Sequence, residues 1–194
     1  MNIAVQRLNE GARTLLYEHF LALPPEDRRF RFGSSLSGEA MTAYVGGIAF
    51  DHDAVFGVHD DDLALVGVAH VGFGDDTAEL GLSVLPAHRG RGVGSVLFER
   101  AAEHARNRFV PRLFMYCLKE NAPIMRIARR FGMDIVTDAG DADAHLALPQ
   151  ASPESIAGEF VIEGFALYDY ALKAEVAAWK GINAALEGAA RPTR

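Results

Sequence analysis

The sequence has little cysteine and no long apolar run, and both absences limit what the chain can be. Cys117 is the single cysteine among 194 residues, so neither a disulfide framework nor a thiolate cluster stabilises the fold. We interpret Cys117 as a small buried apolar side chain. No apolar stretch is long enough to cross a bilayer, and the first residues lack the charged-then-apolar pattern of a secretion signal. We therefore expect a cytoplasmic protein with no membrane contact.

Metal-ligand spacing and excess positive charge are also lacking. The seven histidines show no pattern such as His-Glu-x-x-His, so no metal ion is expected. The formal net charge of −7 argues against nucleic acid as a partner. Acidic residues cluster at 51–53, 60–62, 75–76 and 134–143. They either stabilise turns or surround an entrance that attracts a cationic ligand.

The segment His88–Ser95 (HRGRGVGS) is the clearest functional signal. It lies between Thr77–Leu85, which is typical of a strand, and apolar residues at helical spacing that begin at Val93. Alternating glycines let the main chain approach a ligand, and a helix start offers unpaired N–H groups and a partial positive charge. Arg89 and Arg91 add attraction for phosphate oxygens. The segment therefore predicts a phosphate-binding loop, although a glycine-rich turn that only joins strand to helix is the alternative.

The glycine spacing excludes two common phosphate loops. The nucleoside-triphosphate loop requires Gly-x-x-x-x-Gly-Lys followed by Ser or Thr, and no such string occurs. The dinucleotide fingerprint requires a glycine at the position that Ser95 occupies. The string Arg89-x-x-Gly92-x-Gly94 instead resembles the pyrophosphate loop of the GCN5-related N-acetyltransferase (GNAT) family, and is closest to bacterial protein-lysine acetyltransferases.

The order of predicted elements around the loop supports this resemblance, which covers roughly residues 45–148. We predict strands at 3–8, 54–58, 63–72, 77–85 and 113–118, and a hairpin of 135–136 with 145–148. We predict helices at 12–23, 38–50, from Val93, after Asn121 and at about 163–186. The segment 26–32 is either a solvated loop or one wall of the acceptor site.

These elements predict an α/β fold with a mixed, mostly antiparallel sheet flanked by helices. The strands at 77–85 and 113–118 should be parallel because a long helix separates them. The resemblance implies that this parallel pair splays apart to admit the pantetheine arm of acetyl-CoA. Residues 1–150 are expected to form the acetyltransferase domain. Residues 151–194 are expected to form a helical extension that packs on the same domain or on a second subunit, which leaves a homodimer open.

The resemblance also implies the residues that hold the co-substrate acetyl-CoA. Main-chain groups of Leu82, Ser83 and Val84 would pair with pantetheine amides, and the N–H of Val84 would stabilise the oxyanion. Asn121 would contact the cofactor arm, cap the next helix, or do both. The residues expected around the diphosphate are Arg89, Gly90, Arg91, Gly92, Val93, Gly94 and Ser95.

Glu79 is the candidate general base, because it lies where the lysine-acetylating relatives carry a glutamate. The alternation of Ala78 and Leu80 places Glu79 on the opposite face of its strand, so a surface glutamate is the alternative. The expected acid is missing: many relatives have a tyrosine seven residues after the asparagine, and this position is Ala128. Water or one of four hydroxyls remains as proton source for the thiolate: Tyr116, Ser83, Tyr168 or Tyr170.

The sequence thus predicts an acyl-CoA-dependent N-acyltransferase that uses acetyl-CoA by default. The acceptor would be a primary amine, either a protein lysine or a small cationic amine, and transfer would be direct within a ternary complex. The alternative is a sensor that binds acetyl-CoA without turnover. Chemistry at Glu79 distinguishes the two, because a sensor needs no carboxylate beside the thioester.

Overall fold

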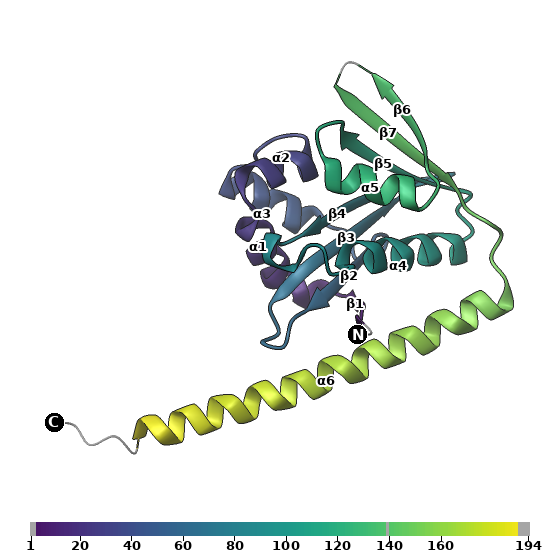
Figure 1. Ribbon diagram of the computed structural model, residues 1–194. Coiled ribbons are helices and arrows are strands. Elements are labelled where there is room, and N and C mark those ends of the chain that lie inside the picture. Colours follow the sequence, from purple (N-terminus) through teal and green to yellow (C-terminus); the bar gives the residue numbers. More distant parts are fainter. Residues whose placement is uncertain (1–2, 139, 190–194) are drawn as a thin grey trace.

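The computed structural model describes residues 3–138 and 140–189. A seven-stranded sheet forms its centre, in the order β1-β2-β3-β4-β5-β7-β6 (Figure 1). Only β4 and β5 are parallel neighbours. This confirms the predicted α/β fold with a mostly antiparallel sheet. The strands are β1 (Gln6–Leu8), β2 (Ala54–His59), β3 (Leu65–Phe73), β4 (Thr77–Val84), β5 (Arg112–Leu118), β6 (Asp134–Asp138) and β7 (Asp141–Ala147).

Helices cover both faces of the sheet and produce two separate hydrophobic cores. On one face, a core that includes Leu97 and Phe98 forms under the loop helix. On the other face, Leu16, Phe20 and Met41 pack against the strands. The helices are α1 (Arg13–Ala22), α2 (Pro25–Phe32), α3 (Gly38–Gly47), α4 (Val93–Asn107), α5 (Ala122–Arg130) and α6 (Pro153–Ala189).

The parallel pair β4–β5 separates after a short paired stretch. Only three residues of β4, Thr77 to Glu79, pair with β5 residues Arg112 to Phe114. From Leu80 onward β4 continues beside β3 but has no partner on its other side. The two strands therefore diverge toward the loop at the head of α4, as Figure 1 shows.

Two segments differ from their sequence predictions. Residues 25–32 form a helix, α2, rather than a solvated loop. The tail helix starts at Pro153, well before the predicted residue 163. Here Ser152 and Ser155 exchange hydrogen bonds between main-chain N–H and side-chain hydroxyl, at 3.0 and 3.2 Å. This reciprocal cap, followed by proline in the first turn, starts a helix before the apolar pattern begins.

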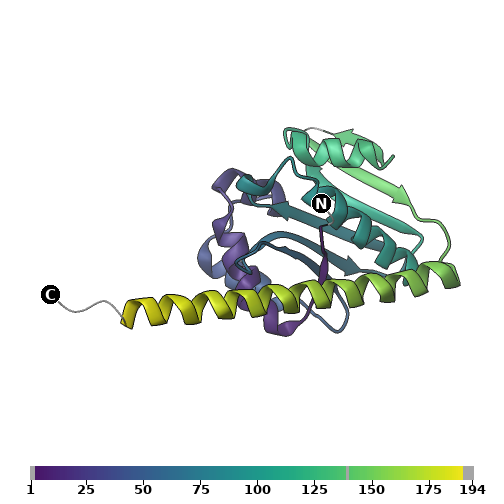
Figure 2. The ribbon, with the colours of Figure 1, turned by 60° about the horizontal axis from the view of Figure 1, so that its bottom comes forward.

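The long helix α6 runs along the bottom of the domain and extends beyond it (Figures 1 and 2). Among the described residues, no helix combines the length and the apolar character that a bilayer-spanning segment needs.

Candidate active site

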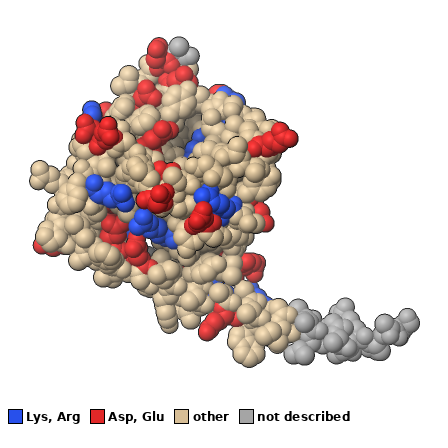
Figure 3. All heavy atoms as spheres, turned by 180° about the vertical axis from the view of Figure 1, so that it is seen from behind, with Lys and Arg blue, Asp and Glu red and all other residues tan. Residues whose placement is uncertain are grey.

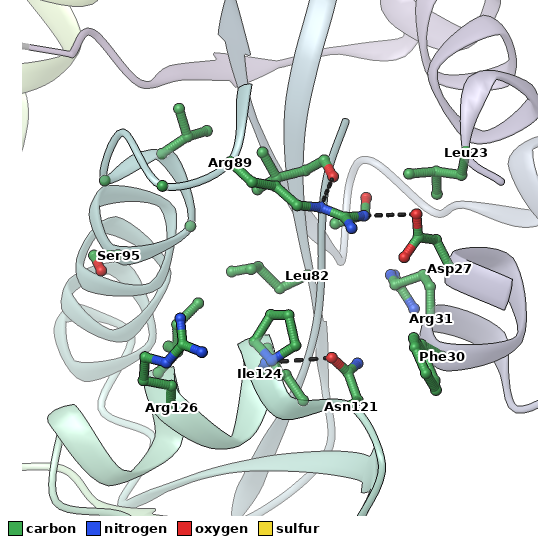
Figure 4. A pocket seen from close by; sticks show the side chains of 18 of the residues that line it. Leu23, Asp27, Phe30, Arg31, Leu82, Arg89, Ser95, Asn121, Ile124 and Arg126 are labelled. Atoms are coloured by element: carbon green, nitrogen blue, oxygen red, sulfur yellow. Dashed lines mark hydrogen bonds and ion pairs between the residues drawn. The ribbon is translucent and has the colours of Figure 1, made fainter. Parts of the chain in front are cut away.

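A cavity of about 510 Å³ opens where β4 and β5 diverge. Its volume lies in the range of small-molecule and cofactor sites. One wall comes from α4 and its loop, the opposite wall from α2, and the floor from β4 and α5 (Figure 4). The residues that line it are Leu23, Glu26, Asp27, Phe30, Arg31, Leu82, Ser83, Val84, Arg89, Gly90, Gly92, Val93, Gly94, Ser95, Asn121, Pro123, Ile124, Arg126, Ile127 and Arg130.

The glycine loop forms one end of this cavity. Gly90 and Gly92 have φ angles of +72° and +89°, a region that side chains with a Cβ adopt only with strain. Gly92 is the N-cap of α4, and its carbonyl accepts hydrogen bonds from Ser95 and Val96. A Cβ on Gly94 would lie 2.9 Å from Ile127 of α5. The glycines thus open the head of α4 to the cavity, where its first N–H groups favour an anion.

The two loop arginines have different positions. Arg89 donates from Nε to the carbonyl of Val84 at 3.0 Å, and its Nη2 forms an ion pair with Asp27 of α2 at 2.7 Å (Figure 4). Arg89 therefore connects the two walls across the cavity. Arg91 is exposed and does not line it. Arg126 and Arg130 of α5, which lie outside the glycine motif, also line the cavity and add positive charge, and Arg130 Nη1 donates to Ser95 Oγ of α4 at 3.3 Å.

The free edge of β4 presents main-chain groups to the cavity. The N–H of Leu85 bonds to the carbonyl of Val66, which identifies this pair as hydrogen-bonded in the β3–β4 ladder. In an antiparallel ladder such pairs alternate, so the N–H and C=O of Ser83 point toward β3. Those of Leu82 and Val84 point toward the gap. Among the described residues, Leu82 thus offers an unpaired N–H and C=O and Val84 an unpaired N–H, whereas the Val84 carbonyl accepts from Arg89 Nε at 3.0 Å.

The Ser83 side chain has a different partner, His19 of α1. Ser83 Oγ lies 2.8 Å from His19 Nε2, and His19 Nδ1 lies 2.8 Å from the carbonyl of Leu65. Because a carbonyl only accepts, Nδ1 carries the hydrogen, and Nε2 accepts from the serine hydroxyl. Burial lowers the pKa of His19 to about 4, so the ring is neutral at neutral pH. This contact anchors α1 to the sheet beside the cavity.

A second hollow of about 20 Å³ continues from the cavity into the gap between the strands. Gly81 and Leu82 of β4 and Tyr116 of β5 line it, together with Arg31. The hydrogen bond to the Asp141 carboxylate raises the pKa of Tyr116, so the phenol stays protonated at neutral pH. Among the four hydroxyls considered as proton source, only Tyr116 and Ser83 border these spaces.

Glu79, the candidate base, lies on β4 at the last residue paired with β5. Its side chain is exposed on the same sheet face as Gly81 and Ser83, outside both hollows. Asn121 lines both hollows, and its Oδ1 accepts from the N–H of Ile124 at 3.3 Å, so it caps α5. Ala128 is fully buried in the core under α5.

The glycine motif gave no indication that residues of α2 would line the cavity. The sequence nevertheless contains signals that predict this helix. Pro25 stands at its first turn with two acidic residues, and two arginines occupy its last turn. Gly33 follows in the left-handed conformation with φ +73°. Proline and acids at the start, with bases and glycine at the end, are typical of a short helix. Asp27, Phe30 and Arg31 thereby reach the cavity.

Known proteins resemble this chain in sequence and in fold. A model of the acetyltransferase (GNAT) family matches residues 14–133. Streptothricin acetyltransferase of Streptomyces lavendulae is 41% identical over 51 residues, which cover 26% of this chain and 27% of that protein. The match thus spans about a quarter of that relative.

Solved structures share the fold over most of the chain at low identity. The GNAT domain of S. lividans PAT has a TM-score of 0.64 at 20% identity, covering 74% of this chain and 89% of that one. The putative acetyltransferase yncA from Salmonella typhimurium, solved with acetyl-CoA, has a TM-score of 0.61 at 17% identity, covering 78% and 97%. The paia N-acetyltransferase from Thermoplasma acidophilum, solved with coenzyme A, has a TM-score of 0.58 at 16% identity, covering 76% and 99%.

Proposed function

This chain belongs to the acetyltransferase (GNAT) family, and from this premise we propose that it transfers acetyl from acetyl-CoA to a primary amine. The acceptor is a protein lysine or a small cationic amine, and transfer is direct within a ternary complex. One observation supports this most: the glycine-opened head of α4 and the unpaired edge of β4 border the same cavity. A diphosphate and an extended amide chain require these two surfaces side by side.

Acetyl-CoA fits the residues present. The diphosphate lies against the first N–H groups of α4 and beside Ser95, with Arg126 and Arg130 adding charge. The pantetheine amides pair with the main chain of Leu82 and Val84, as an added strand would. Its thioester then reaches the narrow hollow between the strands.

Within this arrangement we assign the proton transfers to two exposed side chains. Glu79 removes a proton from the ammonium group, directly or through water. The neutral nitrogen attacks the thioester carbonyl carbon, and a main-chain N–H of β4 stabilises the negative charge on its oxygen. Leu82 lines the narrow hollow and its N–H is placed for this role, whereas Val84, the donor expected from the sequence, lines only the large cavity. The C–S bond then breaks, and the thiolate takes a proton from Tyr116 or from water. The acetylated nitrogen loses its second proton, which restores the proton given to the thiolate and leaves a neutral amide.

The competing function is an acetyl-CoA sensor, which the buried Ala128 favours because it removes the family's usual acid. Release of free CoA thiol, measured with acetyl-CoA and a panel of amines, distinguishes the two functions. Amine-dependent release that Glu79→Gln abolishes supports the enzyme. Calorimetric binding of acetyl-CoA without release across the panel would instead identify the sensor. No binding at all would overturn both.

Two further proposals concern the organisation of the chain. Residues 1–150 act as the catalytic domain, and residues 151–194 extend it, since α6 begins where the last strand of the sheet has ended. The protein works in the cytoplasm, where acetyl-CoA is available.

A further inference from the structure

The guanidinium of Arg31 lies directly on the main chain of β4 at the reacting end of the cavity. A Cβ on Gly81 would stand 2.1–2.3 Å from three of its atoms, so only glycine permits this position. Arg31 lines both the large cavity and the narrow hollow. In Figure 4 it lies on the wall opposite the head of α4. It is therefore placed beside the thioester, away from the diphosphate end.

A chain of hydrogen bonds holds Arg31 in this position. His70 Nε2 lies 3.0 Å from the Asp53 carboxylate, which only accepts, so Nε2 carries the hydrogen. His70 Nδ1 therefore accepts from the hydroxyl of Tyr44 at 2.8 Å. The Tyr44 oxygen in turn accepts from Arg31 Nη2 at 2.9 Å. Burial lowers the pKa of His70, which keeps the ring neutral and this direction of bonding intact.

Arg31 lacks an anionic partner. Among the described residues, two other arginines on the α2 side of the cavity form ion pairs, Arg29 with Glu120 and Arg89 with Asp27. Arg126 and Arg130 also have no ion pair within the described chain, but they line the cavity on the α4 side, where the diphosphate is proposed to lie. Arg31 makes one hydrogen bond, to a neutral hydroxyl, and its buried Nε has no partner. A guanidinium has five N–H donors in a planar fork that matches a carboxylate. The free donors of a rigid, partly desolvated arginine at a binding site indicate an anionic ligand.

Resting on the proposed function, we propose that Arg31 binds a carboxylate of the amine acceptor. Glu79 and Gly81 are two residues apart on one face of β4, so the acid and the guanidinium over Gly81 lie side by side. A negative and a positive group at this separation complement a zwitterion. The acceptor is a free amino acid such as lysine or ornithine, which belongs to the small cationic amines of the proposed function, with its amine toward Glu79 and its carboxylate on Arg31. The carboxylate that binds Arg31 has one alternative source. It would belong to the acyl group of the co-substrate, if that co-substrate is a dicarboxylic acyl-CoA.

Matched acceptors test the assignment. Lysine and ornithine are compared with cadaverine and putrescine, which lack only the carboxylate, using acetyl-CoA and the Arg31→Met protein. We expect kcat/KM for the amino acids to fall at least tenfold and that for the diamines to change less than twofold. Arg31→Lys should restore part of the loss, and Arg29→Met on the same helix is the control. Equal losses for both acceptor types would overturn the proposal.

Two further experiments distinguish this proposal from its alternatives. A preference for succinyl-CoA over acetyl-CoA that Arg31→Met removes would assign the carboxylate to the acyl chain and overturn the acceptor assignment. Calorimetry with the CoA-saturated protein measures amino-acid binding without turnover. Binding that Arg31→Met weakens tenfold supports the proposal even if no transfer occurs, whereas absence of binding in the wild-type protein overturns it.

A second, independent inference concerns helix α6. This helix contacts the domain with its polar face. Glu159 pairs with the buried Arg100 of α4 at 2.7 Å. Further along, the Lys173 amine donates to the carbonyl of His59 at 3.1 Å, and Lys180 pairs with Asp62 at 3.2 Å. Charged contacts thus hold the helix along its length, together with the buried Ala166 and with Tyr170 against His59, while most of its large apolar residues point elsewhere.

An apolar stripe covers the opposite side of α6. Its members recur at intervals of three and four residues, which places them on one side of the helix. They are Val161, Phe165, Tyr168, Leu172, Val176, Trp179 and Ile182, with 73, 50, 64, 45, 52, 66 and 53% of their surface exposed. In Figure 3 the described part of α6 that emerges beyond the domain is tan with few red or blue atoms.

The structure assigns this stripe to the α6 of a second copy, in an antiparallel two-fold pair. The stripe is nearly symmetric about Leu172. In an antiparallel pair centred on Leu172, Phe165 of one copy contacts Trp179 of the other, and Tyr168 contacts Val176. Seven such side chains expose on the order of 100 Å² each, close to the ~800 Å² per partner of a stable interface. A membrane surface fits poorly, because acidic residues outnumber lysines in α6 by six to two (Glu154, Glu159, Glu163, Asp169, Glu175, Glu187; Lys173, Lys180).

Light scattering after size exclusion at tens of micromolar tests the pairing. We expect a dimer for the wild-type protein and a monomer for Leu172→Glu, with unchanged helicity by circular dichroism. Leu167→Glu is the matched control, since Leu167 is 59% exposed but lies on the other flank of the helix. A monomeric wild-type protein, equal dissociation by both variants, or binding of the wild-type protein to anionic vesicles would overturn it.

Discussion

The two walls of the cavity bind by different means. The α4 wall offers main-chain N–H groups opened by Gly90, Gly92 and Gly94, and any residue that fits these torsions would do the same work. The α2 wall offers side chains, Asp27 and Arg31, whose function depends on their charge. Under the proposed function, the wall that binds the constant co-substrate is built mainly from backbone groups, and the wall that binds the variable acceptor is built from side chains. The predictions below test this division.

The largest effect is expected from a side chain placed in the backbone wall. Gly92→Val should weaken coenzyme A binding more than a hundredfold, because φ +89° strains valine and its side chain enters the anion site. Calorimetric titration with CoA measures this effect. Gly46→Val is the control, since a Cβ there meets nothing within 4 Å. Comparable CoA affinity in both variants would refute the role of the loop.

The second largest effect is expected at Glu79, the proposed general base on β4, the strand between the two walls. Glu79→Gln should lower kcat about a hundredfold, as loss of a general base does, while the Kd for CoA stays unchanged. The exposed Glu99→Gln on α4 should leave kcat unchanged. Steady-state kinetics over pH 6–9 provide the check. A Glu79→Gln protein with wild-type kcat would show that another group accepts the proton.

The third effect concerns the back of the α4 wall, which α6 braces. Burial raises the pKa of Glu159, but hydrogen bonds from His104, Asn107 and Arg100 outweigh it and lower the pKa from 4.5 to about 2. A lowered folded-state pKa contributes stability above pH 4.5 that is lost as the pH falls toward 2. The contribution is up to about 3 kcal/mol.

Urea unfolding at pH 7 and at pH 3 measures this contribution. The wild-type protein should lose more stability than Glu159→Gln between the two pH values. Parallel losses in the two proteins would show that Glu159 is not the group responsible.

The smallest effect is expected from the ion pair between Asp27 and Arg89, which connects the two walls. The Asp27 carboxylate competes with phosphate for Arg89, so Asp27→Asn should tighten CoA binding a few-fold at low salt. Arg89→Met should weaken it by a similar factor. Titrations at 20 and 300 mM salt measure both. Weaker binding by Asp27→Asn would mean that the ion pair shapes the cavity rather than competing for the ligand.

Much of the α4 wall was predictable because its signals are local. The strand at 77–85, the loop and the helix from Val93 follow one another in the chain, and the fold class they predicted is confirmed. The contacts of the other wall join residues far apart in sequence. Arg89 with Asp27, and Ser83 with His19, are separated by about sixty residues, and no spacing rule connects them.

Arg31 illustrates the same limit within one short segment. Its charge and its aromatic neighbours suggested either a solvated loop or a wall of the acceptor site. Only the packing of α2 against Gly81, and the bonds through Tyr44 and His70, place its guanidinium beside the reacting end. Likewise a tail helix at about 163–186 was predicted from the sequence, but that its polar side faces the domain was not.

The sequence by itself determined the mixed sheet, the glycine-opened helix start and the family. The reason is that torsion preferences, hydrophobic periodicity and motif spacing act between near neighbours along the chain. Tertiary structure alone decided which side chains share the cavity, where the guanidinium of Arg31 is held and which face of α6 stays exposed. These depend on the crossing of distant elements, where burial and electrostatics set the character of each group.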